Sequence, residues 1–279
     1  MTKSHKMPSR RQILGVLGGA AAGVPLITHT PLWGQSACAV ISSPSLTEGP
    51  YFVDEDLNRR DIRFDSDGSM QAGLPLSLAI NVSQLVDCNP VPLTGAYVDI
   101  WHCNAAGVYS DIAAQNATGH TFLRGYQPTD RHGNVYFVTV YPGWYQGRAV
   151  HIHAKVRTFN GTSESYEFTS QFFMDDAFTD EVYRLAPYNT RGIRDTRNSN
   201  DGIYGGASSL ASTTSNSGSH LMLGLRNKSA WVEADARLVL DLSLGNSPDQ
   251  TPGGGGPGGP GGPPPGGPFP PPGNASQAG

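Results

Sequence analysis

Hydrophobic residues alternate with polar ones along several short stretches of the chain, and turn-forming residues separate these stretches. The clearest case is residues 74–86, where Leu76, Leu78, Ile80 and Val82 occupy every second position. Side chains two apart lie on the same face of a strand, so this stretch predicts a half-buried β-strand. The same criteria predict further strands at 96–102, 134–141, 149–159, 167–174 and, as one or two strands, within 231–244.

The segments around the predicted strands contain little helix. Residues 36–60 are typical of an extended arm and residues 87–92 of a turn. Residues 175–185 predict a short helix, and residues 186–220, rich in Asn, Asp, Gly, Ser and Thr, a long loop with little regular structure. The composition, with 35 glycines, 22 prolines and only 15% charged residues, favours many turns. We therefore expect an all-β fold, a β-sandwich of mainly antiparallel strands with long loops and few short helices.

The two ends of the chain differ in composition from the predicted domain. Residues 1–35 hold four basic residues and then an uncharged, mostly apolar run at 13–27, as in an export signal. Ser9 to Leu14 resembles a twin-arginine signal; an ordinary secretory signal is the alternative. At the other end, residues 252–273 are Gly or Pro except Phe269, so residues 246–279 predict a disordered tail. Residues 36–245 remain as one domain, which we expect to be periplasmic or extracellular.

The charge of the exported form argues against two classes of partner. Residues 1–35 contain no acidic residue, so their removal lowers the formal charge from −4 to −8. An acidic domain is a poor ligand for nucleic acid and for anionic membranes. We therefore expect no nucleic-acid binding and no membrane insertion of the mature form.

The chain has three cysteines, Cys38, Cys88 and Cys103, and an exported protein can oxidise them. Cys88 lies in the turn after the first predicted strand, and Cys103 lies at the far end of the second. If these two strands pair as a hairpin, the two thiols are roughly 30 Å apart. A Cys38–Cys88 disulfide is therefore predicted, with Cys103 as a buried thiol.

The strand predicted at 149–159 carries the sharpest chemical pattern. His151 and His153 lie two positions apart and therefore project from the same face, opposite Val150 and Ile152. Two imidazoles on one strand face can bind a metal ion, although a surface pair or two hydrogen-bonded histidines fits the same pattern.

Two tyrosines lie close to this pattern. Tyr145 follows a Pro-Gly turn that can direct it back toward the strand, and Tyr109 comes just after the strand predicted at 96–102. Each tyrosine by itself fits an ordinary core or rim residue.

Together these stretches resemble a known family. Residues 101–109, 122–130, 142–145 and 148–153 follow the order and spacing of the intradiol ring-cleavage dioxygenases, most closely the protocatechuate 3,4-dioxygenase branch. Residues 47–51 resemble the N-terminal arm of that family. The resemblance covers residues 45–185, and residues 186–245 fit less well.

The resemblance implies a non-haem ferric ion, Fe(III), held by four side chains: Tyr109, Tyr145, His151 and His153. The chemistry of these residues agrees with that ion. A free phenol has a pKa near 10, so only a strong Lewis acid keeps two phenols ionised at neutral pH. Two phenolates also offset most of a 3+ charge in a buried site. Zinc sites more often use His, Cys and carboxylate ligands.

The resemblance also implies roles for residues around the metal. Arg148 would stabilise negative charge on the substrate ring, Tyr145 would also act as a base, and Gln171 would lie near the oxygen-binding space. Pocket-lining roles fall to four residues: Gly49, Pro50, Tyr51 and Trp144. The remaining histidines have no such support and are expected to be structural: His102, His120, His132 and His220.

The implied reaction opens the ring of a catechol-type aromatic diol with O2, between the two hydroxyl-bearing carbons, to a cis,cis-muconate-type product. Family members often assemble, which leaves a homo-oligomer open. The alternative is a non-catalytic β-sandwich module that binds a polysaccharide or cell surface. A hydrolase ranks last, because the sequence has neither a Gly-x-Ser-x-Gly nor a His-Glu-x-x-His motif.

Overall fold

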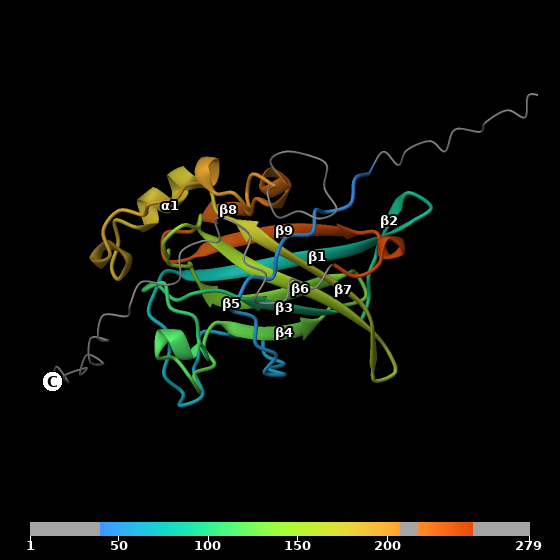
Figure 1. Ribbon diagram of the computed structural model, residues 1–279, viewed down its shortest axis with the longest axis horizontal. Coiled ribbons are helices and arrows are strands. Elements are labelled where there is room, and N and C mark those ends of the chain that lie inside the picture. The colour runs from blue at the N-terminus through green and yellow to red at the C-terminus, as the bar shows by residue number, and fades with distance from the viewer. Residues whose placement is uncertain (1–39, 207–216, 248–279) are drawn as a thin grey trace, which may run out of the picture. The chain divides into compact units, whose positions relative to one another are not determined.

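A computed structural model of the chain describes residues 40–206 and 217–247, so the predicted export signal and the tail from residue 248 onward lie outside the described residues. The described chain forms two β-sheets and one short α-helix, α1 (Asp176–Val182), which confirms the predicted all-β sandwich (Figure 1). The strands are β1 (Pro75–Val86), β2 (Asn89–Pro92), β3 (Tyr97–Trp101), β4 (Arg124–Pro128), β5 (Asn134–Val140), β6 (His151–Asn160), β7 (Ser163–Phe173), β8 (Gly224–Asn227) and β9 (Val232–Leu240).

The first sheet has the order β2-β1-β9-β8, with β5 also paired to β1, and the second has the order β4-β3-β6-β7. Neighbouring strands are antiparallel except β1 and β9, which run parallel and side by side in Figure 1. Because β3 and β6 are neighbours, Trp101 at the end of β3 lies in register with His153.

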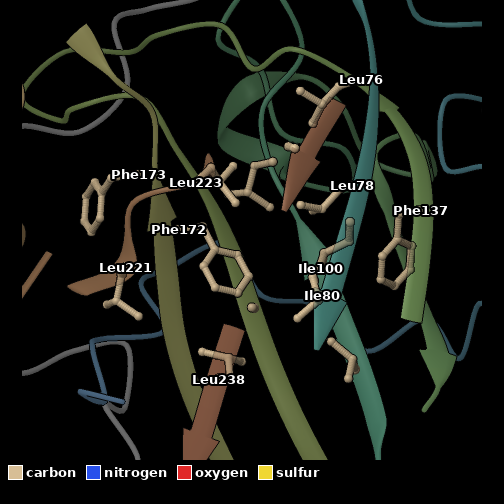
Figure 2. Close-up of a cluster of buried hydrophobic side chains, with 14 of the residues drawn as sticks. Leu76, Leu78, Ile80, Ile100, Phe137, Phe172, Phe173, Leu221, Leu223 and Leu238 are labelled. Atoms are coloured by element: carbon tan, nitrogen blue, oxygen red, sulfur yellow. The ribbon is translucent and has the colours of Figure 1, made fainter. Parts of the chain in front are cut away.

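The hydrophobic core lies between the two sheets. The alternating residues of β1, among them Leu76, Leu78 and Ile80, are buried there, as the sequence predicts. Ile100 of β3 and Phe172 of β7 belong to the same core from the second sheet (Figure 2). Burial of these apolar side chains supplies the main driving force that holds the two sheets together.

The outer face of the second sheet is also covered, and this places the site. The extended arm before β1 crosses β7 and β6: the Leu46 amide donates to the Thr169 carbonyl (3.0 Å), and Asp54 forms an ion pair with Arg157 (2.6 Å). As a result the first seven residues of β6 are all buried, although apolar and polar residues alternate along them. His151 and His153 therefore lie under the arm rather than in solvent.

Three strands lie where the sequence indicates none. β2 falls within the stretch predicted as a turn, with Asp87 and Cys88 at positive φ forming the actual turn. β4 contains Gly and Pro, and the exposed four-residue β8 has no hydrophobic alternation. Pairing with neighbouring strands, rather than local propensity, forms these elements.

The hairpin assumed between the first two predicted strands is wrong, because β1 and β3 belong to different sheets. Cys88 is nevertheless disulfide-bonded and Cys103 is a free, buried thiol, as predicted. The predicted partner, Cys38, lies outside the described residues. Burial raises the pKa of the Cys103 thiol to about 12.

The segment after α1 is irregular, as predicted, but it is not merely a surface loop. It contains the short 3-10 helices Tyr188–Thr190 and Asn198–Asn200. Tyr188 is buried, donates its hydroxyl to the Tyr141 carbonyl (2.7 Å) and accepts from the Leu74 amide (3.0 Å). None of the helices in the described segments is long and apolar enough to cross a membrane.

A buried histidine outside the site gives a pH-dependent stability. His102 Nδ1 lies 2.9 Å from the Cys103 carbonyl and Nε2 lies 2.7 Å from Thr139 Oγ1, and burial lowers the pKa of His102 to about 4. The unfolded chain binds this proton near pH 6.5, so the stabilisation is present above pH 6.5 and is lost as the pH falls toward 4.

The wild-type protein should lose unfolding free energy when the pH falls from 7.5 to 5. We expect this loss to be about 2 kcal/mol smaller in His102→Gln, because the variant has no imidazole to protonate on unfolding. Urea unfolding at the two pH values measures it. The exposed His132→Gln is the matched control and should keep the wild-type slope. An unchanged slope in His102→Gln would contradict the assignment.

Candidate metal centre

The four predicted metal ligands come together on the outer face of the second sheet. His151 and His153 are the first and third residues of β6, Tyr145 lies in the loop before this strand, and Tyr109 lies in the loop after β3. The Tyr145 hydroxyl lies 3.2 Å from His151 Nε2, which lies 3.0 Å from His153 Nε2. The ring centroids of Tyr109 and Tyr145 are 5.7 Å apart, and those of Tyr109 and His153 6.1 Å.

His151 presents the lone pair of Nε2 to the other donor atoms. His151 Nδ1 lies 2.6 Å from the Ala149 carbonyl, which can only accept, so Nδ1 carries the proton and Nε2 is free to donate to a metal. His153 is stacked on Trp101, with ring centroids 4.7 Å apart and planes 8° apart. Burial, and next the charge of Arg148, lowers the pKa of His151 to about 3; burial also holds the pKa of His153 well below its usual value. Both imidazoles are therefore neutral at physiological pH.

The two tyrosine hydroxyls complete the set of donor atoms. Tyr109 Oη is buried and has no hydrogen-bond partner, an arrangement that costs free energy unless something else binds it. Burial raises the pKa of Tyr145 to about 12 and that of Tyr109 well above 10. Within residues 40–206 and 217–247, no three His, Cys, Asp or Glu side chains cluster as a metal site. Two phenolic oxygens and two imidazole nitrogens that converge in a buried place fit a hard, highly charged cation.

A buried arginine lies beside the donor set. Arg148 donates through Nε to Asp201 (2.9 Å) and through Nη2 to the Gln171 side-chain oxygen (2.5 Å). Gln171 in turn donates to the Thr47 carbonyl of the arm (2.7 Å). The charge of Arg148 lowers the pKa of Tyr145 against the dominant effect of burial. The predicted residues Arg148 and Gln171 are thus brought together, whereas Asp201 was not among them.

Comparisons with known proteins find similarity to dioxygenases. The profile of a family described as Dioxygenase matches residues 47–165. An intradiol ring-cleavage dioxygenase from Tetranychus urticae has a similar structure, with 28% identity, a TM-score of 0.62, and coverage of 75% of this chain and 98% of its own. The chain is therefore similar to intradiol ring-cleavage dioxygenases in part of its sequence and in its fold.

A second similar structure supports the fold alone. The dioxygenase domain of a dioxygenase carbohydrate-binding protein fusion from Streptomyces sp. SirexAA-E is 24% identical, with a TM-score of 0.50, and the match covers 72% of this chain and 99% of that domain. Sequence comparison with curated proteins gives no match.

The arm brings two of the predicted pocket residues to the site. Gly49 has a φ of +75° and lies against His153, since a Cβ at this position would be 3.5 Å from His153 Cε1. Tyr51 stacks on Tyr109 with ring centroids 4.5 Å apart and meets Tyr145 edge-on at 6.0 Å. Pro50 between them is exposed.

Trp144, the fourth predicted pocket residue, lies differently. It packs against the main core, and the Arg191 guanidinium lies 4.8 Å from its ring centroid. Its indole N–H is buried without a partner.

Two residues that support the site escaped sequence analysis. Trp101 reaches His153 only through the register of β3 and β6, which the sequence does not reveal. Arg124 lies on the unpredicted strand β4 and donates to the Tyr51 carbonyl (2.7 Å) and the Ser110 carbonyl (2.6 Å). It therefore ties the arm to the loop that carries Tyr109.

We expect Arg124→Met to lower the free energy of unfolding by about 3 kcal/mol, because two buried carbonyls lose a charged donor. Urea unfolding measures the change. Arg226→Met on β8 is the matched control: the ion pairs of Arg226 are exposed and should contribute little. If both substitutions lowered the free energy of unfolding equally, Arg124 would not be the residue that connects the arm to the loop carrying Tyr109.

Proposed function

We propose that this protein is an exported, Fe(III)-dependent intradiol dioxygenase that cleaves catechol-type aromatic diols with O2 to cis,cis-muconate-type products. The observation that carries the proposal is the buried convergence of four donors with Tyr109 Oη left unpartnered. Tyr109, Tyr145, His151 and His153 would hold the ion. When bound, ferric iron supplies Lewis acidity toward the phenols and the diol and makes the ring reactive toward O2.

The chain's own residues supply charge balance and proton transfer. As phenolates, Tyr109 and Tyr145 offset two positive charges in a site that contains no carboxylate ligand among its four donors. The neutral imidazoles of His151 and His153 add donors without adding charge. As a phenolate, Tyr145 Oη would accept a proton from one substrate hydroxyl, since burial raises the pKa of this side chain to about 12.

Arg148 is suited to stabilise negative charge that develops on the substrate. Its guanidinium is buried, so it acts in a low-dielectric environment and needs no reorganisation during the reaction. Gln171 holds both Arg148 and the arm, and the arm residues Gly49 and Tyr51 limit the access of water. These contacts keep the charged groups oriented before the substrate arrives.

The test is the visible spectrum of protein purified without chelator, before and after anaerobic addition of catechol. We expect a broad tyrosinate-to-Fe(III) band that shifts to longer wavelength with catechol, and O2 uptake with a ring-opened diacid as product. Tyr109→Phe and His151→Ala should weaken or abolish the band and the O2 uptake, because each removes a ligand.

Tyr136→Phe, an exposed residue on β5, is the matched control and should keep both signals. A protein that stays colourless after ferric iron is supplied, and takes up no O2 with catechol, would sink the proposal. A binding module for polysaccharide or a cell surface would then be the better interpretation.

Export is the second part of the proposal, and the support for it is the basic start and apolar run within residues 1–35. We expect protein recovered from outside the cytoplasm to begin between residues 35 and 38. N-terminal sequencing measures this, and replacement of Arg10 and Arg11 by Lys should block export by the twin-arginine route. An intact N-terminus on all recovered protein would contradict cleavage.

A further inference from the structure

Asp201 is a buried carboxylate whose two oxygens are fully used. It follows the 3-10 helix Asn198–Asn200, and its side chain is 0% exposed. Oδ2 accepts from Arg148 Nε (2.9 Å) and from the Ala149 amide (2.7 Å). Oδ1 accepts from the Ile203 amide (2.7 Å) and the Tyr204 amide (2.9 Å). Four donors therefore fix the carboxylate in one orientation.

These contacts determine where the guanidinium of Arg148 lies. Its side-chain partners are Asp201 on one side and Gln171 on the other. The same oxygen of Asp201 that binds Arg148 also binds the Ala149 peptide, whose carbonyl accepts from His151 Nδ1 (2.6 Å). Asp201 is thus held at a fixed place relative to the strand that carries the histidines.

We propose that Asp201 is a positioning residue that holds the Arg148 guanidinium beside the Tyr145 phenol, and that it acts on the reaction only through Arg148. This rests on the proposed function. The two Ile203 and Tyr204 contacts would suit a residue that merely stabilises its own turn. The Oδ2 contacts do not, because they bind Arg148 and Ala149, which lie 53 and 52 positions earlier in the sequence.

Charge supports the same role. Burial disfavours the charged carboxylate, yet Arg148 and the peptide N–H groups hold the pKa of Asp201 below its usual range. The pair is therefore ionised and neutral overall. Removing the anion would leave a buried cation without its counter-charge, and such a cation moves or takes up water.

The experiment compares Asp201→Asn with wild type, with Arg148→Gln and with the double variant, all loaded with iron. Asp195→Asn is the matched control, because exposed Asp195 binds the neighbouring Gly147 amide (3.2 Å) and does not touch Arg148. The readouts are iron content, the visible band, thermal unfolding, and kcat and KM for catechol from O2 uptake.

We expect Asp201→Asn to lower kcat roughly 10- to 100-fold, the range seen when a residue that orients a site is lost. Iron content, the band of the resting protein and KM should change little, because no ligand is altered. In the Arg148→Gln background the same substitution should lower kcat less than about 3-fold, since residues that act as one unit are not additive. Asp195→Asn should match wild type.

A folded Asp201→Asn variant with wild-type kcat would overturn the proposal. It would also be overturned if the fold-decrease in kcat of the double variant equalled the product of the fold-decreases of Asp201→Asn and Arg148→Gln. Loss of iron from the folded variant would also overturn it, since Asp201 would then act on the ligand set. If Asp201→Asn does not fold, Asp201→Glu keeps the charge but displaces Arg148 by one methylene; a wild-type kcat there would overturn the proposal. Wild-type protein without a band and without O2 uptake would instead remove the proposed function, and this inference with it.

Discussion

The structure depends on burying one face of β6 that carries four basic or imidazole side chains. His151, His153, Lys155 and Arg157 lie at every second position and are all buried. Lys155 and Arg157, toward the C-terminal end of β6, are buried together with carboxylates. Lys155 pairs with Glu48 and Glu167, and Arg157 pairs with Asp54 and Asp99. Glu48 and Asp54 belong to the arm, so these ion pairs also hold the arm over the sheet. Without these carboxylates, Lys155 and Arg157 would be buried charges without partners, which is costly.

At the start of β6, no carboxylate lies among the side chains that converge with His151 and His153. This part of the strand face therefore has neutral donor atoms instead of ion pairs. His151 and His153 remain neutral because burial lowers the pKa of both imidazoles, and the adjoining groups are phenols. Along one face of β6, the neutral donors His151 and His153 are therefore followed directly by the ion-paired residues Lys155 and Arg157. The arm serves both ends: Glu48 binds Lys155, while the next residue, Gly49, lies against His153. The residues that stabilise the arm and the residues that cover the site are thus adjacent in sequence.

The sequence predicted most of what depends on local order and little of what depends on pairing. Alternation located β1, β3, β5, β6, β7 and β9, and the two-residue spacing placed His151 and His153 on one face. β4 was missed because its Gly and Pro oppose strand formation locally, and Arg124 was missed with it. Trp101 could not be connected to His153, because the register of β3 against β6 is a tertiary property. Asp201 was hidden for a similar reason, since its segment has the composition of a loop and its partner lies 53 positions earlier.

Because β1 pairs in parallel with β9, the first sheet can be completed only after the ribosome has synthesised residues 232–240. β1 is the middle strand of the first sheet, and β9 is its neighbour on one side. The two strands pair from Leu76, opposite Val232, to Gln84, opposite Leu240. A nascent chain exposes the apolar face of β1 long before the ribosome has made that neighbour, and closing so long a loop is slow. Until then the chain presents an unpaired hydrophobic edge that is prone to aggregate. A fragment that ends before residue 232 would keep the four predicted metal ligands and still lack the strand that completes the first sheet.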